Sequence, residues 1–222
     1  MLTVWTMCVG DKYPAEYVYN LASMVKRNLS VPYRLVCITD QANDIEFRRA
    51  QSAGGIEFMQ PPTDYPGWWG KIGLFKQDIA TGPSIWLDLD VVITGSLDPI
   101  VEQYGDCQLA TPWNWAQSGH GGCQSSVMCW RGNSAHEIFE SFDPADAHWP
   151  PRNDGGKLWG DQEHLTVCRD NGFPVTRIDD KYVRSYKYHC RNGVPEDARV
   201  IVFHGKPDPH EVSDKWVTDA WC

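Results

Sequence analysis

Residues 84–96 read Ser-Ile-Trp-Leu-Asp-Leu-Asp-Val-Val-Ile-Thr-Gly-Ser. An apolar run leads directly into Asp88-Leu89-Asp90, which predicts a buried strand that ends in two carboxylates. In an extended chain, side chains two residues apart point to the same side, so Asp88 and Asp90 would project together. Two like charges at that spacing are costly without a cation between them, and a divalent metal bound to a phosphate would supply one. The alternative is a strand end whose carboxylates are simply solvated.

Strands and helices alternate on the N-terminal side of this stretch. The sequence predicts one helix that Pro14 opens, a second helix over residues 69–77, and strands over residues 2–9, 34–39, 56–59 and 84–87. This succession indicates an α/β fold with an open, mostly parallel sheet flanked by helices. Ligands collect where the strands of such a sheet end, at Gly10-Asp11, Asp40 and Asp88–Asp90.

The second half of the chain has a more mixed pattern. It predicts helices over 134–142 and 161–168, a Pro/Gly-rich loop over 148–158, and strands over 125–130 and 199–203. Neither an internal repeat nor a linker interrupts the chain, so we expect a single domain over residues 1–222.

Composition excludes several classes of function. A net charge of −9 and a pI near 5.2 provide no broad field that would attract nucleic acid or anionic membrane. Eight cysteines without a CxxC pair favour a reducing compartment over a disulfide framework or a zinc site. The sequence shows neither a signal-peptide pattern nor an apolar run long enough to cross a membrane. These features predict a soluble, cytoplasmic protein.

Several segments match one family in order. Asp88-Leu89-Asp90 near mid-chain and Phe203-His204-Gly205-Lys206-Pro207 after a late strand resemble the GT-A glycosyltransferases, particularly the glycogenin and galactosyltransferase-like (family 8-type) group. The resemblance covers nearly the whole chain. It implies a Rossmann-like GT-A domain in which residues 1–100 bind the nucleotide and residues 101–222 the sugar and the acceptor. It also implies that Asp88, Asp90 and His204 hold Mn²⁺, or Mg²⁺, against the diphosphate of a nucleotide sugar.

The same resemblance implies the residues that bind the donor. Lys71, in Trp-Trp-Gly-Lys-Ile-Gly, stands where the family contacts the diphosphate or the sugar, and Gly205 and Lys206 stand at a second phosphate contact. Gln124-Ser125-Ser126-Val127-Met128 is similar to the family's Asn-Ser-Gly-Val-Met strand, which lines the donor sugar, although it differs at positions 124 and 126. The base and ribose would rest on a set of residues at the first two strand ends: Cys8, Gly10, Asp11, Tyr13 and Asp40.

Gly160-Asp161-Gln162-Glu163 resembles the family's Gly-Asp-Gln-Asp, which implies catalytic roles for Asp161 and Gln162 beside the reacting sugar. The expected reaction is metal-dependent transfer of a sugar, from a UDP-sugar in particular, to an acceptor hydroxyl with retention. An inverting enzyme would instead need a carboxylate base such as Glu163 or Asp161. The alternatives are a sugar nucleotidyltransferase, whose Gly-rich phosphate loop is a poor match here, and a non-catalytic nucleotide-sugar and metal-binding module.

One basic segment stands apart in an acidic chain. Residues Arg177–Arg191 contain five basic and two acidic side chains with three interleaved tyrosines. A solvated edge strand explains this composition, and so does a patch that binds a phosphate-bearing or polymeric acceptor. We expect the acceptor to be a glycan, a protein or a small molecule. A modified DNA base is a less favoured option.

Overall fold

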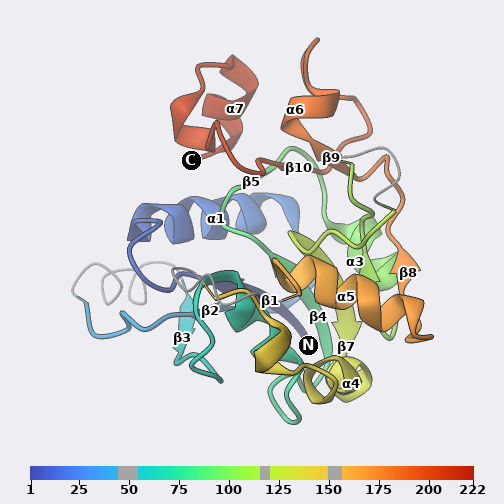
Figure 1. Cartoon of the computed structure of the whole chain (residues 1–222). Coiled ribbons are helices and arrows are strands. Elements are labelled where there is room, and N and C mark those ends of the chain that lie inside the picture. The colour runs from blue at the N-terminus through green and yellow to red at the C-terminus, as the bar shows by residue number, and fades with distance from the viewer. Residues whose placement is uncertain (45–54, 116–120, 150–156) are drawn as a thin grey trace.

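Figure 1 shows the computed structural model of the chain, which describes residues 1–44, 55–115, 121–149 and 157–222. Within these residues the main sheet has seven strands, which are, in spatial order, β3 (Ile56–Met59), β2 (Tyr33–Ile38), β1 (Leu2–Met7), β4 (Pro83–Leu87), β7 (Val127–Arg131), β6 (Ala110–Thr111) and β8 (Thr176–Arg177).

The first four strands of this order are mutually parallel, as the sequence predicts. Their carboxyl ends therefore meet at one edge, where Gly10, Asp40 and Asp88 follow β1, β2 and β4. Strand β7 runs antiparallel to β4, so it is the start of β7 that lies at this edge. The Asp88 N–H donates to the Ser126 carbonyl at 3.0 Å and continues the ladder one step beyond β4.

A second sheet, which the sequence analysis did not anticipate, holds the C-terminal part of the chain. The described residues give it three strands, β5 (Val91–Ile93), β10 (Val200–Val202) and β9 (Val183–Ser185), with β10 antiparallel to β5 and parallel to β9. Because β5 begins directly after Asp90 and β10 ends beside it, the Phe203 N–H donates to the Asp90 carbonyl at 3.0 Å. This pairing carries the segment 203–207 to the carboxylates of β4.

Helices cover both faces of the main sheet. The helices are α1 (Ala15–Asn28), α3 (Asp98–Tyr104), α4 (His136–Glu140), α5 (Asp161–Asp170), α6 (Tyr186–His189) and α7 (Lys215–Ala220), with short 3-10 helices η2 (Gly132–Ala135), η3 (Pro144–Asp146) and η4 (Pro209–Glu211). Of these, α6 and α7 pack against strands of the smaller sheet (Figure 1). The helix expected over 134–142 is divided between η2 and α4. The loop expected over 148–158 lies partly outside the described residues.

The helix expected over residues 69–77 is a 3-10 helix, η1 (Gly67–Phe75). Glycines recur here at every third residue, which matches the three residues per turn of a 3-10 helix. The glycine side of η1 packs closely against neighbouring residues. A methyl group at Gly73 would lie 2.8 Å from Pro62 Cγ, and one at Gly70 would lie 3.0 Å from Met7 Sδ. The glycine spacing was therefore the signal for this geometry.

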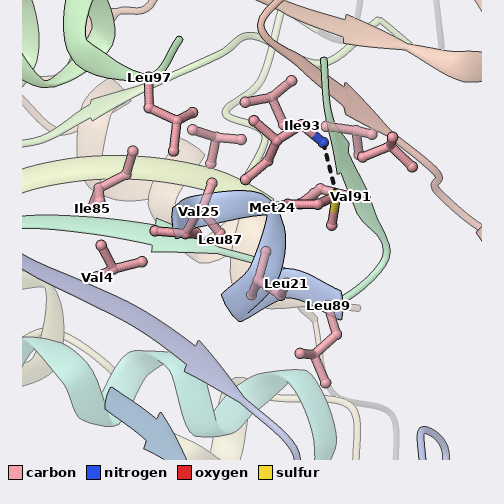
Figure 2. Packing of buried hydrophobic residues seen from close by; sticks show 14 of the residues in the cluster. Val4, Leu21, Met24, Val25, Ile85, Leu87, Leu89, Val91, Ile93 and Leu97 are labelled. Atoms are coloured by element: carbon pink, nitrogen blue, oxygen red, sulfur yellow. Dashed lines mark hydrogen bonds between the residues drawn. The ribbon is translucent and has the colours of Figure 1, made fainter. Parts of the chain in front are cut away.

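Alternating side chains of β1 and β4 supply two cores. Val4 and Ile85 pack with Leu21, Met24 and Val25 of α1, which lies between the main sheet and the smaller one (Figures 1 and 2). The Ile93 N–H donates to Met24 Sδ at 3.3 Å and ties the smaller sheet to this helix. The opposite face buries four of the eleven tryptophans, Trp5, Trp69, Trp86 and Trp130. These four side chains are structural.

All eight cysteines are free thiols. No helix in the described part of the chain combines the length and the apolar character that crossing a bilayer requires.

Candidate functional site

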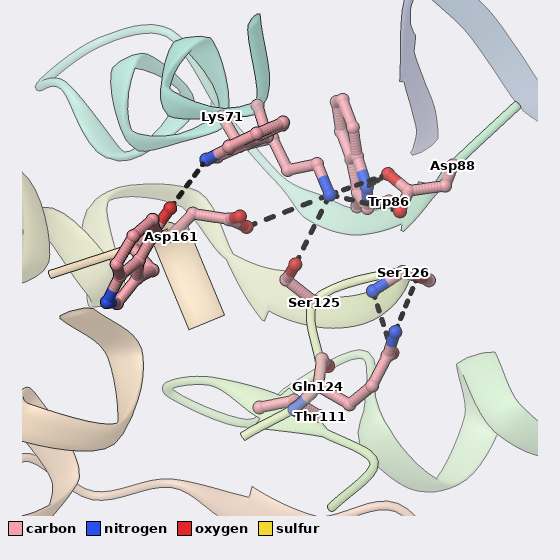
Figure 3. A network of polar contacts seen from close by, with 10 residues as sticks. Lys71, Trp86, Asp88, Thr111, Gln124, Ser125, Ser126 and Asp161 are labelled. Atoms are coloured by element: carbon pink, nitrogen blue, oxygen red, sulfur yellow. Dashed lines mark hydrogen bonds and ion pairs between the residues drawn. The ribbon is translucent and has the colours of Figure 1, made fainter. Parts of the chain in front are cut away.

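A buried lysine joins four segments at the carboxyl edge of the sheet (Figure 3). Lys71 Nζ, from η1, lies 2.7 Å from Asp88 Oδ1 and 3.0 Å from Asp88 Oδ2. It also donates to Ser125 Oγ at 3.2 Å and lies 3.7 Å from Asp161 Oδ2 at the start of α5. The sequence-predicted residues Lys71, Asp88, Ser125 and Asp161 thus form one network.

Electrostatics keep this lysine charged. Burial alone would lower the pKa of the Lys71 ammonium, but the carboxylates of Asp161 and Asp88 outweigh burial and raise it. The Trp86 Nε1–H donates to Asp88 Oδ1 at 2.9 Å, and its ring lies 5.5 Å from Lys71 Nζ. Both oxygens of Asp88 are therefore engaged by donors of the protein.

Asp90 has a different environment. Its Oδ2 accepts a hydrogen bond from the Tyr13 hydroxyl at 2.9 Å, the one side-chain donor to this carboxylate in the described part of the chain. Burial and the neighbouring Asp88 carboxylate raise the pKa of Asp90 to about 6. A buried carboxyl beside a second carboxylate is a group that an added cation would stabilise.

Asp161 keeps one oxygen without a partner. The residue is only 4% exposed, and burial raises the pKa of its carboxyl. Its Oδ2 makes no hydrogen bond within the described residues, although Lys71 is near. An acceptor buried without a donor costs free energy, which a ligand hydroxyl could recover.

Most of the predicted site residues line two adjoining cavities. The larger, about 410 Å³, is bounded by Lys71, Asp88, Asp90, Gln124, Asp161, Gln162, His204 and Gly205. The smaller, about 220 Å³, is bounded by Cys8 and Tyr13 and shares Lys71, Asp88 and Asp90 with the first. The shared residues make the Asp88–Asp90 strand end the junction of the two cavities.

Four of the predicted binding residues lie beside these cavities rather than on their walls. The Gly10 N–H donates to Asp40 Oδ1 and Oδ2, both at 3.2 Å, and Asp11 is exposed. Ser125 is buried beneath the wall and contacts Lys71. Their contact with a nucleotide or sugar stays a prediction.

Gln124 and Ser126, the two departures from the family pattern, bond to each other. Gln124 Nε2 donates to Ser126 Oγ at 2.6 Å, and the Ser126 N–H donates to Gln124 Oε1 at 2.8 Å (Figure 3). Both ends of the amide are therefore engaged by Ser126, in the segment that leads into β7. The two substitutions act as a unit, because a glycine at 126 would remove one of these bonds.

His204 reaches the larger cavity but does not join the two aspartates in a compact cluster. Its Nε2 lies 2.6 Å from Ser185 Oγ, and its ring stacks with Tyr188 and Trp115. Among residues 1–44, 55–115, 121–149 and 157–222, no group of three His, Cys, Asp or Glu side chains is arranged as a metal site. The three-residue metal site stays a prediction.

Lys206 does not line the cavity, and another lysine lies close to Gly205. Lys206 is exposed and pairs with Asp208 at 2.7 Å and Glu211 at 2.8 Å, away from the cavity wall. Lys187 of α6 instead lies against Gly205, where a methyl group would be 3.3 Å from its Nζ. Burial, together with the positive charge of Lys187, lowers the pKa of His204. The sequence spacing did not indicate Lys187, because α6 follows β9, and the pairing of β9 with β10 brings it near Gly205.

Other wall residues were also missing from the sequence analysis. The larger cavity is lined in addition by Lys12, Trp68, Asn114, Trp159 and Thr166. The Trp- and Gly-rich composition around 67–70 and 159–160 was the signal that could have identified two of them.

Part of the basic segment is neutralised locally. Arg177 pairs with Asp180, and Lys181 Nζ lies 3.2 Å from Asp179 Oδ2. Arg177 also stacks on the Trp113 ring, with 4.8 Å between the guanidinium carbon and the ring centroid. The two acidic residues thus offset two of the five basic ones, which favours the interpretation as a solvated edge.

A cavity of about 590 Å³ lies elsewhere, between α4 and α5. Its wall contains the buried contact between His164 Nε2 and Cys168 Sγ at 3.5 Å, but burial raises the pKa of this thiol. None of the predicted site residues lines it. Its wall also contains charged residues, but two of them, Asp146 and Lys157, form an exposed ion pair at 2.8 Å.

Solved structures share this architecture. The galactosyltransferase LgtC, in complex with donor and acceptor sugar analogues, aligns over 93% of this chain and 88% of its own, with a TM-score of 0.64 and 17% identity. The chain has the fold of these glycosyltransferases. GlyE of Streptococcus pneumoniae TIGR4 aligns over all of this chain and 61% of its own, with a TM-score of 0.67 and 13% identity. No protein-family model matches the sequence, and no curated protein matches it either.

Proposed function

We propose that this protein is a metal-dependent glycosyltransferase that moves a sugar from a nucleotide-diphosphate sugar, UDP-sugar in the first instance, to an acceptor hydroxyl. The observation that carries the proposal is one cavity, on a glycosyltransferase fold, that gathers Asp88, Asp90, Lys71, Asp161 and His204. Fold similarity alone does not specify a reaction, whereas this set of charged groups has a chemistry of its own.

The donor set fits Mn²⁺ or Mg²⁺. Asp88 and Asp90 provide hard oxygen ligands, His204 a nitrogen ligand, and Asp90 is the buried carboxyl that most needs a positive partner. When bound, the cation supplies charge stabilisation at a diphosphate. Lys71 adds a fixed positive charge at the same point, held by Asp88 and Asp161.

The other residues have roles that follow from their positions. Asp161 has one carboxylate oxygen that makes no hydrogen bond within the described residues, and Gln162 lies next to it on the cavity wall. We assign both to the reacting sugar, whose ring carbon gains positive character as the leaving group departs. Retention follows in this proposal from attack on the face that the diphosphate leaves. Tyr13 and Cys8 line the smaller cavity, where we place the base and ribose.

Eight free thiols are stable in a reducing compartment, so we place the protein in the cytoplasm.

A thermal-shift panel tests the donor and the cation together. UDP-, GDP- and TDP-sugars are added with and without Mn²⁺, and the melting temperature is recorded. A true donor at 100 times its Kd stabilises the folded state by about 2.7 kcal/mol. We expect this stabilisation only when nucleotide sugar and Mn²⁺ are both present. A melting temperature that no combination raises would contradict the proposal, and Mn²⁺-dependent release of free sugar separates an enzyme from a binding module.

Lys187 and Lys206 form a matched pair for the phosphate contact. We expect Lys187→Met to raise the KM for the donor about tenfold, because it removes a charge-assisted contact. Lys206→Met should leave the KM unchanged, since Lys206 is engaged by Asp208 and Glu211. Initial-rate kinetics with varied donor measure both constants. If Lys206→Met raised the KM for the donor and Lys187→Met did not, Lys206 would be the phosphate contact instead.

A further inference from the structure

Two exposed tryptophans stand on the wall of the larger cavity. Trp159 is 63% exposed and Trp68 is 46% exposed, whereas the four core tryptophans are fully buried. Large apolar rings in contact with water lower stability unless a ligand covers them, and such patches mark binding sites in soluble proteins.

The protein itself holds these rings in place. The Trp68 Nε1–H donates to the Trp159 carbonyl at 3.2 Å, and the Trp159 N–H donates to Glu163 Oε2 at 2.5 Å. The rings of Trp159 and His148 have centroids 4.3 Å apart. The Trp68 ring is thus tied to the backbone of Trp159, and the Trp159 ring contacts His148, so both rings have protein contacts before any ligand binds, which reduces the entropic cost of binding. We call these two side chains the Trp68–Trp159 platform.

The platform lies beside the groups assigned to the reacting sugar. Trp159 precedes Asp161 by two residues, and Gln162 and Glu163 continue along the same wall. We propose that the Trp68–Trp159 platform binds a pyranose ring of an uncharged saccharide acceptor. This inference rests on the proposed function, since it assigns the acceptor side of the same cavity.

The chemistry of the wall favours a saccharide. A pyranose has a C–H face that packs on an aromatic ring and a rim of hydroxyls that donate to carboxylate or amide oxygens. Asp161, Gln162 and Glu163 supply such oxygens. The indole N–H of Trp68 is already engaged by Trp159, so its ring offers a flat apolar face.

The charges on the wall disfavour a nucleic-acid acceptor. Binding of single strands combines aromatic stacking with cations that follow the backbone. In the described residues, the lysines on this wall are Lys12 and Lys71; together with Trp68 they also line the smaller cavity, whereas Trp159 lines only the larger one. Asp161 and Glu163 would instead repel phosphates near the platform.

A glycan array of neutral oligosaccharides, probed with the full-length fluorescent protein, tests the inference. Titration of the strongest glycan then measures its Kd. Trp159→Ala should weaken this binding at least about tenfold, because the stacking surface is lost, whereas Trp159→Phe retains a ring and should recover most of it. Trp68→Ala provides a second variant at the other ring. Val194→Ala, an exposed apolar change outside the cavity wall, is the control and should bind like the wild type.

Three outcomes would overturn the inference: no neutral glycan binds, Trp159→Ala and Trp68→Ala both bind like the wild type, or a single-stranded dT oligonucleotide binds in place of glycans. Mn²⁺-dependent hydrolysis of the donor is measured in parallel on the wild type. Hydrolysis without glycan binding rejects the saccharide platform alone, whereas glycan binding that requires the tryptophans, without donor turnover, rejects the proposed enzyme alone.

Discussion

Asp90→Asn is expected to reduce Mn²⁺-dependent donor turnover by about 10²- to 10³-fold, because one oxygen ligand and one negative charge are lost at the cation site. The same substitution should leave the melting temperature unchanged or raise it. An amide oxygen can still accept from Tyr13, while the repulsion from the buried Asp88 carboxylate disappears. Activity and stability would thus move independently, as expected of a functional charge rather than a structural one.

Two further variants show whether this effect is specific to Asp90. Asp88→Asn should also abolish turnover but lower the melting temperature, because Asp88 is the closest ion-pair partner of the buried Lys71. Asp106→Asn, an exposed aspartate that pairs with Arg131 outside both cavities, should change neither property. Donor turnover in Asp90→Asn at the wild-type rate with Mn²⁺ would reject the role of the aspartate pair.

Lys71→Met is expected to destabilise the fold by about 3–5 kcal/mol, as removal of one partner from a buried ion pair does. The ammonium is the cation that faces Asp88 and Asp161, and its side chain is only 8% exposed. Removing it leaves two buried carboxylates without compensation. Urea unfolding followed by tryptophan fluorescence measures the free energy of unfolding.

A double-mutant cycle separates this charge effect from a simple packing defect. Adding Asp161→Asn to Lys71→Met removes one of the stranded carboxylates and should recover part of the lost stability. The control is the double mutant that combines Lys71→Met with Asp106→Asn, in which we expect no recovery of stability. Equal stability losses in the single mutant and in the double mutant with Asp161→Asn would show that charge is not the cause.

The sequence predicted the parallel half of the sheet well because its signals are local. Apolar runs and the residues that end them define β1, β2, β3 and β4 to within about two residues. The helix predicted over 69–77 is the 3-10 helix η1; its glycine spacing fits three residues per turn, but the prediction did not specify the helix type. The pairing of β5 with β10 could not be predicted, since it joins segments about a hundred residues apart.

The sequence likewise predicted only part of the candidate site. Lys71, Asp88, Asp161 and His204 were identified by resemblance, and the structure brings all four to one cavity. The proximity of Lys187 to Gly205 and the pairing of Trp68 with Trp159 were not predicted, because contacts between distant segments leave no mark in local spacing, although the Trp- and Gly-rich composition marked both tryptophan segments. Gln124 and Ser126 looked like independent departures in the sequence, and their mutual hydrogen bonds unite them.

A short ladder between β5 and β10 connects the C-terminal segment to the strand that follows Asp90. Three residue pairs, Val91 with Val202 through Ile93 with Val200, hold the strand that leads to His204 against the strand that follows Asp90. All six side chains of the ladder are buried, so this short pairing joins the C-terminal segment to the core. A ligand that bound both Asp90 and His204 would be a non-covalent cross-link between two positions that are 114 residues apart in the chain. Binding of such a ligand would stabilise the C-terminal segment, and loss of structure in that segment would weaken the binding.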